Sequence, residues 1–97
     1  MEMKFEWDEK KNSINQMKHG VSFKEAATVL SDPNRYELYD RAHSLFERRW
    51  LVIGINGCGV LTVCFTERKN ITRIISARKA NKNEKETYFN EYDKVCN

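Results

Sequence analysis

The side chains best suited to chemistry in this sequence are arginines and lysines gathered in one C-terminal block. Residues 68–85 contain seven basic residues against a single acidic one, Glu84, whereas the remainder of the 97-residue chain is slightly acidic. The formal net charge of +3 therefore comes from this block. Because guanidinium groups are planar, bidentate donors to phosphate, the block is a candidate phosphate-binding surface, although an ordinary solvated surface explains most blocks of this kind.

Two histidines and one tyrosine are candidates for proton transfer. His43 lies in a polar loop, residues 40–44, where it is either an acid–base residue or a plain surface residue. His19 precedes Gly20 at an expected helix end, which favours a structural role over catalysis. Tyr88 is most simply a helix-stripe residue whose hydroxyl needs a polar partner. The sequence has no metal-ligand cluster, Gly-rich phosphate loop or Ser-His-Asp order, so it favours acid–base chemistry without metal or cofactor.

Length and composition predict one globular domain over residues 1–97, with 93–97 as a tail; 40% of the residues are hydrophobic and 32% are charged. No apolar stretch approaches about 18 residues and the first residues lack a signal-peptide core, so no membrane association is expected. Cys58, Cys64 and Cys96 lack the spacing of a disulfide framework or zinc site. This pattern favours a reducing, cytoplasmic compartment, with Cys64 as a small core residue.

Apolar periodicity and capping signals predict three helices. The first covers residues 9–18, the second follows almost at once and stops at Asp32-Pro33, and the third opens at residues 81–84. The expected capping residues are Asp8 and Gly20 for the first helix, and Ser22 and Glu25, as a capping box, for the second. The apolar stripe of the third comprises Tyr88, Phe89, Tyr92 and Val95.

Alternation with a period of two predicts the strands. They comprise a short edge strand at 4–7 and longer strands at 35–40, 49–55, 60–66 and 71–77. Turns at 56–59 and 68–70 would join the last three into an antiparallel meander, with 35–40 as a fourth neighbour. The predicted fold class is α+β: an antiparallel sheet of about four to five strands, with two N-terminal helices and one C-terminal helix, and with one face of the sheet covered by helices.

Simple alternation along the last strand assigns its side chains to two faces. Ile71, Arg73, Ile75 and Ala77 share one face, and Thr72, Ile74, Ser76 and Arg78 share the other. Arg73 and Arg78 are therefore expected on opposite faces of the sheet.

Three blocks of the sequence together resemble the BrnT family of toxins, over about residues 3–92. The N-terminal block comprises Phe5-Glu6-Trp7-Asp8, Lys11, Asn15, residues 18–23, Glu25-Ala26 and Asp32-Pro33. The central block comprises His43-Ser44, Glu47, Arg49 and Ile53-Gly54. The C-terminal block comprises Thr66-Glu67-Arg68, residues 73–80, Glu84 and Tyr88.

The resemblance implies the toxin of a bacterial type II toxin–antitoxin pair, with a RelE-like ribonuclease fold. Its expected activity is metal-independent cleavage of RNA, which inhibits translation and growth. Its expected partner is a BrnA-type antitoxin in a hetero-oligomer, a heterotetramer in our prediction. Operator DNA would be bound only through the antitoxin.

Metal-independent RNA cleavage uses the 2′-hydroxyl of the substrate as nucleophile, and the enzyme supplies a base, an acid and cations for the phosphate. The predicted catalytic residues are Arg78, Glu67, Arg68, His43 and Tyr88. Arg78 would be the main phosphate and transition-state ligand, His43 or Glu67 the base or acid, and Tyr88 a phosphate-positioning residue or proton donor. Predicted RNA contacts are Lys79, Arg73, Lys69 and Lys82, with Lys79 and Arg68 assisting Arg78.

The predicted antitoxin-binding residues are Trp50, Tyr36 and Tyr39, since aromatic residues on strands that stay partly exposed suit a protein interface. Two other functions remain open. One is a non-enzymatic inhibitor that binds RNA or ribosomes through the basic block. The other is a corepressor module in which only the antitoxin interface matters.

Overall fold

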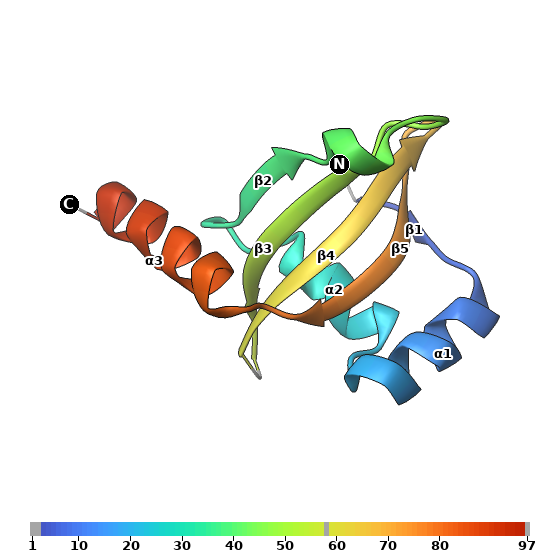
Figure 1. Cartoon of the computed structure of the whole chain (residues 1–97), viewed down its shortest axis with the longest axis horizontal. Coiled ribbons are helices and arrows are strands. Elements are labelled where there is room, and N and C mark those ends of the chain that lie inside the picture. Colours follow the sequence, from blue (N-terminus) through green and yellow to red (C-terminus); the bar gives the residue numbers. More distant parts are fainter. Residues whose placement is uncertain (1–2, 58, 97) are drawn as a thin grey trace.

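The computed structural model describes the backbone of residues 3–57 and 59–96, and side chains within 3–57 and 59–90 (Figure 1). Its elements are β1 (Phe5–Glu6), α1 (Glu9–His19), α2 (Phe23–Val29), β2 (Tyr36–Tyr39), the 3₁₀ turn η1 (Arg41–His43), β3 (Trp50–Asn56), β4 (Gly59–Arg68), β5 (Ile71–Lys79) and α3 (Lys82–Cys96). The predicted order of strands and helices is confirmed. The predicted stripe positions Tyr92 and Val95, and the turn residue Cys58, lie outside the described side chains.

Five strands form one sheet in the order β1-β5-β4-β3-β2. Strands β2 to β5 make the predicted antiparallel meander, and Lys69 and Asn70 have φ of 52° and 67°, as a two-residue type I′ hairpin requires. The sheet is nevertheless mixed, because β1 pairs parallel to β5, with Phe5 opposite Thr72. The wholly antiparallel prediction was wrong because a two-residue strand carries no register signal. Helices α1 and α2 form part of the connection between β1 and the rest of the sheet, and this connection lets β1 pair parallel to the free edge of β5.

The local signals at the helix ends are confirmed. The Asp8 side chain accepts hydrogen bonds from the backbone N–H groups of Lys10 and Lys11, and Gly20 ends α1 with φ of 70°. Ser22 and Glu25 form the complete capping box at the start of α2. These local bonds fix where α1 and α2 begin and end before any packing is considered.

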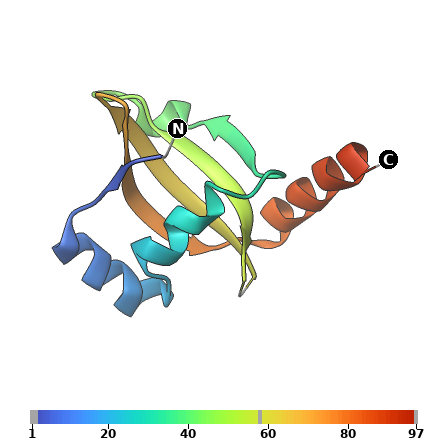
Figure 2. The same ribbon diagram turned by 180° about the vertical axis from the view of Figure 1, so that it is seen from behind.

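The helices divide between the two faces of the sheet. Helices α1 and α2 lie together on one side (Figure 2), and α2 packs on a buried cluster that includes Val52, Val63, Phe65 and Ile74. Helix α3 instead packs its first turns on the opposite face, where Tyr88 joins Ile53, Val60, Ala80 and Tyr36. The prediction that helices cover one face is therefore wrong for α3. Most of the second face stays uncovered by helices, and we call it the open face.

A β-bulge in β5 changes which side chains share the open face. Phe65 pairs with Ile74 but Cys64 pairs with Ser76, so Ile75 is an extra residue in β5. Beyond the bulge the alternation is inverted, and Arg78 opposite Thr62 lies on the same face as Arg73 opposite Thr66. The prediction that Arg73 and Arg78 occupy opposite faces is corrected, because a one-residue insertion exchanges the two faces of a strand.

Close packing between α2 and β3 makes Gly54 a sensitive position. A Cβ atom at residue 54 would lie 2.8 Å from Val29 Cγ1 and 3.3 Å from the Val29 carbonyl oxygen. Since Val29 is fully buried, we expect Gly54→Ala to lower the free energy of unfolding by about 1–3 kcal/mol. Urea unfolding measures this loss. Gly57→Ala, where nothing lies within 4 Å, is the control, and equal stabilities of the two variants would contradict the packing argument.

Candidate active site on the open face

The loop between β2 and β3 holds the polar residues of the open face in place. The Asp40 backbone N–H donates to the Arg49 carbonyl at 2.9 Å and closes the loop. Inside it, the Ser44 hydroxyl donates to the Asp40 carbonyl at 2.5 Å and accepts from the Arg49 N–H at 3.0 Å. The loop therefore presents His43, Glu47 and Arg49 at the end of the sheet where β4 and β5 are joined.

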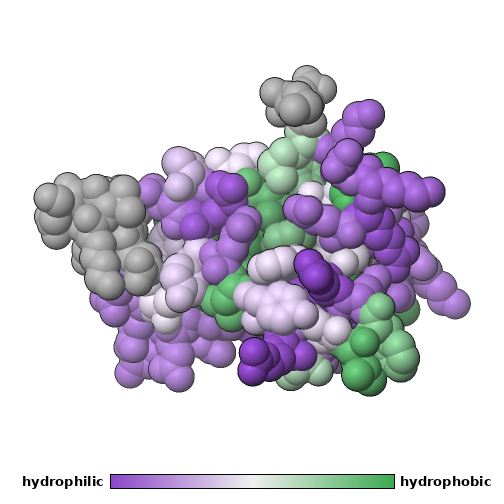
Figure 3. Space-filling model, turned by 90° about the horizontal axis from the view of Figure 1, so that it is seen from above, coloured by the Kyte–Doolittle hydropathy of each residue, from purple (hydrophilic) through white to green (hydrophobic). Residues whose placement is uncertain are grey.

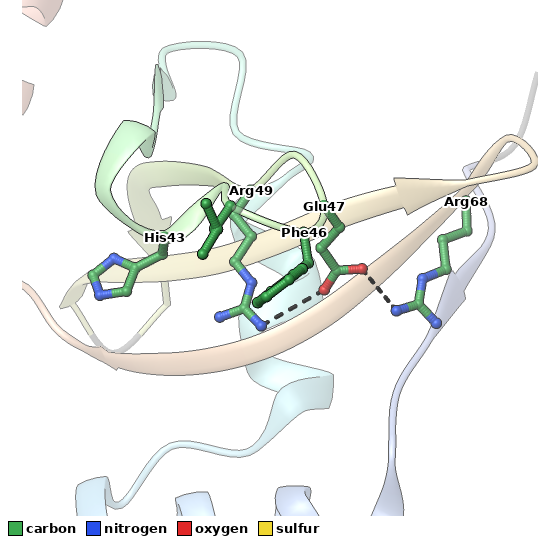
Figure 4. A pocket seen from close by; sticks show the side chains of 6 residues that line it. His43, Phe46, Glu47, Arg49 and Arg68 are labelled. Carbon is green, nitrogen blue, oxygen red and sulfur yellow. Dashed lines mark hydrogen bonds and ion pairs between the residues drawn. The ribbon is translucent and has the colours of Figure 1, made fainter.

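Glu47 brings together Arg49 of the β2–β3 loop and Arg68 of β4, as the close-up shows (Figure 4). Its Oε2 lies 2.7 Å from Arg68 Nη2, and its Oε1 lies 3.6 Å from Arg49 Nη2. The hydrogen bond from Arg68 is the main reason that the pKa of Glu47 lies below its ordinary value, so this carboxylate stays ionised between two cations. We call Glu47, Arg49 and Arg68 the arginine cluster.

The arginine cluster lines a pocket of about 400 Å³ together with His43, Leu45 and Phe46. Within the described residues, the Nε of Arg49 is buried and has no hydrogen-bond acceptor. A buried donor without an acceptor is costly. The Arg49 and Arg68 side chains both line the pocket, and phosphate suits a guanidinium fork.

His43 is oriented by a carboxylate. Its Nδ1 lies 2.9 Å from Asp40 Oδ2, while 68% of the His43 side chain remains exposed. An ionised Asp40 favours a proton on Nδ1, which leaves the Nε2 lone pair available to a substrate. The pair has the arrangement of a general base with its positioning residue.

Two further arginines of the open face lie farther along β5. Arg73 Nη1 is 3.5 Å from Glu6 Oε1. Arg78 makes a bidentate ion pair with Glu84, with distances of 2.6 and 2.8 Å. This pair raises the pKa of Arg78; burial raises the pKa of Glu84, but bonds from Arg78 and the Asn81 N–H leave it below its ordinary value. Arg78 is thus bound to the start of α3.

The structure does not bring every predicted site residue to the pocket. Glu67 lies between Thr66 and Arg68 in β4, and its side chain alternates to the other face, where it lines a small pocket with Trp50 and Phe65. It also lines a second pocket that includes Glu47 and Arg68. The Tyr88 side chain is 1% exposed and its hydroxyl donates to Asp32 Oδ2 at 2.6 Å. Neither side chain lies beside His43.

The predicted lysines are distributed around the sheet. Lys69 lies in the β4–β5 turn, and Lys82 is exposed at the start of α3. Lys79 lines a separate cavity of about 330 Å³ near the β3–β4 turn, together with Glu25 and Lys85. The other histidine, His19, ends α1 far along the chain from the arginine cluster and is half-buried.

The predicted antitoxin residues lie on β2 and β3. Tyr39 contacts Trp50 edge to face, with ring centroids 5.0 Å apart, and Tyr39 is exposed. Tyr36 is half-buried and packs against the cluster around Tyr88. The register puts Tyr36 opposite Ile53 and Tyr39 opposite Trp50, so the two tyrosines lie on opposite faces.

Tyr88→Phe separates packing from catalysis at this position. Removing the hydroxyl takes one hydrogen bond from Asp32, so we expect the free energy of unfolding to fall by about 1 kcal/mol. We expect RNA cleavage to stay within twofold of the wild-type rate. Unfolding and cleavage are measured on the same purified protein. Unchanged stability with lost cleavage would instead make the Tyr88 hydroxyl a catalytic group.

Sequence reasoning assigned no role to Asp40, Glu47 or Arg49. Glu47 and Arg49 were present in the central block of the resemblance, two residues apart just before a strand. That spacing puts both side chains on one side of an extended chain, which was the available signal. For Asp40 the sequence offered only its position three residues before His43. Its role depends on how the loop closes, which the sequence does not show.

The fold and the site define a small α+β protein with a cationic pocket on an uncovered sheet face. A family model described as the ribonuclease toxin BrnT of type II toxin–antitoxin systems matches residues 7–84. The chain belongs to this family of ribonuclease toxins. A comparison with curated proteins gives no match.

Two features are absent from the residues that the structure describes. No three His, Cys, Asp or Glu side chains among them are grouped as metal ligands. None of the helices in the same part of the chain has the length and apolar character needed to cross a membrane.

Proposed function

We propose that the chain is a metal-independent endoribonuclease that acts at the arginine cluster, inhibits translation and growth, and is neutralised by a BrnA-type antitoxin. Its membership of a ribonuclease toxin family supports the general activity. The single observation that carries the location is the meeting of Arg49, Arg68 and an oriented His43 around one pocket. The proposal also includes a RelE-like relationship of the fold and a cytoplasmic location.

The chemistry follows from what these side chains offer. The substrate's 2′-hydroxyl attacks the adjacent phosphorus as His43 Nε2 accepts its proton, and the bond to the 5′-oxygen breaks to leave a 2′,3′-cyclic phosphate. Arg49 and Arg68 stabilise the added negative charge on the phosphate oxygens. A protonated group, His43 or a water molecule, returns a proton to the 5′-oxygen. Asp40 and Glu47 act as positioning residues.

Arg73 and Arg78 extend this surface along β5. Both lie on the open face, so an RNA strand that enters at the arginine cluster passes them in turn. We propose that Arg73 contacts the RNA backbone directly. A phosphate at Arg78 would compete with Glu84, because both terminal nitrogens of the guanidinium group donate to that carboxylate. Lys69 is a further proposed backbone contact.

The antitoxin is proposed to bind over β2, where Tyr39 and its neighbour Trp50 offer an aromatic pair. An interface there borders the β2–β3 loop, and it lies on the opposite face of the sheet from the arginine cluster. In this proposal, toxin and antitoxin form a hetero-oligomer, a heterotetramer, and this complex binds DNA only through the antitoxin.

The test is cleavage of end-labelled RNA by the purified chain in excess EDTA. We expect products that end in a 2′,3′-cyclic phosphate, and we expect them to disappear when the antitoxin is added. Binding of the RNA without cleavage would favour the non-enzymatic inhibitor. Normal growth after induction without antitoxin would favour the corepressor.

A further inference from the structure

Two large apolar side chains project from the β2–β3 loop directly beside the arginine cluster. Phe46 is 96% exposed and Leu45 is 83% exposed, and both line the pocket with His43, Arg49 and Arg68. Figure 4 shows the Phe46 ring on the same side of the loop as the Arg49 and Glu47 side chains. Figure 3 looks onto this end of the molecule, where small apolar patches interrupt a hydrophilic surface.

Exposure of this ring is not explained by the fold. Burial of a phenylalanine is favourable, and Trp7 shows that an aromatic side chain elsewhere in the chain finds a partner, Phe23, with centroids 6.3 Å apart. Phe46 instead stands in a loop that is rich in charge: residues 41–49 contain Arg41, Arg48 and Arg49 against Glu47. An exposed aromatic ring among cations is the arrangement by which proteins bind single-stranded nucleic acids, where the ring stacks on a base and the cations hold the backbone.

We propose that Phe46 is a stacking platform for an unpaired base next to the scissile phosphate. This rests on the proposed ribonuclease function and adds a substrate class to it: single-stranded RNA with a base turned out of its stack. The cations of the pocket hold the phosphate, and a ring can reach only a base that is free of pairing. A double-stranded substrate keeps its bases inside the helix and gives Phe46 nothing to stack on.

The charge of the surroundings favours RNA over a protein partner as the occupant. The pocket wall beside Phe46 carries Arg49, Arg68 and His43 with one carboxylate, Glu47. Its volume of about 400 Å³ lies in the range of sites that take a small ligand. A nucleotide supplies both partners at once: its phosphate is the anion for the guanidinium groups, and its base is the flat surface for the Phe46 ring.

The experiment measures cleavage and binding with the same set of variants. Substrates are a short single-stranded RNA, the same RNA in a duplex, and a 2′-O-methyl copy that cannot be cleaved because it lacks the nucleophile. We expect Phe46→Ala to lower kcat/KM on the single strand, and affinity for the 2′-O-methyl copy, by between about five- and a hundredfold. Phe46→Trp should keep both within about threefold. The matched control is Met17→Ala, which removes an equally exposed apolar side chain (89%) from α1.

Abasic substitution identifies the stacked base. One nucleotide of the 2′-O-methyl copy at a time is replaced by an abasic residue, and the wild type should lose affinity at one position beside the scissile bond. At that position Phe46→Ala should show no further loss, because ring and base contribute through one contact. Two results would overturn the inference. One is that the affinity losses from the abasic substitution and from Phe46→Ala add at that position. The other is that Phe46→Ala leaves RNA affinity unchanged, including the case in which it weakens only antitoxin binding. Failure of the wild type to cleave RNA, with ring-dependent binding intact, would overturn the ribonuclease proposal and leave the stacking site.

Discussion

Arg49→Ala is expected to abolish growth arrest when the toxin is induced without its antitoxin, and to lower the cleavage rate of the purified protein by about 10²–10³-fold. The reason is electrostatic: a donor placed where charge develops in the transition state contributes a rate factor of about this size. Arg49 lines the pocket, its Nη2 lies 3.6 Å from Glu47 Oε1, and its buried Nε lacks an acceptor among the described residues.

The fold should survive this substitution. The bonds that close the loop are made by the Arg49 backbone, to Asp40 and to the Ser44 hydroxyl, and alanine keeps both. Arg35→Ala is the matched control, since it removes an arginine that pairs with Glu37 on the surface, and its toxicity should be that of the wild type. Circular dichroism and capture of the antitoxin show whether the variant is folded. A folded Arg49→Ala protein with full toxicity at equal expression would place the active centre elsewhere, with Arg78 as the next candidate.

Asp32→Ala is expected to produce the largest loss of stability of the single substitutions considered, about 2–3 kcal/mol. Asp32 Oδ2 accepts from the Tyr88 hydroxyl at 2.6 Å and from the Ile55 N–H at 2.8 Å, while Oδ1 accepts from the Asn34 N–H at 2.8 Å. One carboxylate therefore joins the end of α2 to β3 and to α3. Removing it breaks three hydrogen bonds, one of them from a tyrosine that is 1% exposed, and a hydrogen bond contributes about 0.5–1.5 kcal/mol to stability.

The same carboxylate predicts how stability depends on pH. Burial raises the pKa of Asp32, but bonds from the Ile55 N–H, the Tyr88 hydroxyl and the Asn34 N–H outweigh it and leave the pKa below its ordinary value of 3.8. A carboxyl whose pKa is lowered by folding contributes stability above its unfolded pKa, and this stability is lost as pH falls through the folded value. The difference in unfolding free energy between wild type and Asp32→Asn should therefore shrink as the pH falls from about 5 to about 3. A constant difference over that range would contradict the account.

The sequence predicts most of this fold because its signals are local. Asp8, Ser22 with Glu25, and the 68–70 turn each determine a helix end or a hairpin within four residues. Two features of the fold have no local sequence signal. The parallel pairing of β1 joins residues more than sixty positions apart. The bulge at Ile75 depends on how β4 and β5 align, and strict alternation cannot reveal an extra residue.

The candidate site was predicted less fully than the fold. The basic block pointed to Arg68 and Arg73, which both lie on the open face, and the loop position pointed to His43, which lines the pocket with Arg68. What joins them is a carboxylate from another segment: Glu47 approaches Arg68 across 21 positions of sequence. Composition and spacing cannot show that Arg78 is taken up by Glu84, or that the Tyr88 hydroxyl is taken up by Asp32, because both pairings exist only after α3 packs against the sheet.

The most direct test of the central claim is the single-turnover cleavage of one labelled RNA by wild type and Arg49→Ala in excess EDTA. The account predicts that the wild type forms 2′,3′-cyclic phosphate ends and that Arg49→Ala, folded and able to bind antitoxin, forms them about 10²–10³-fold more slowly. Equal rates for the two proteins, or cleavage by the wild type that EDTA abolishes, would contradict it.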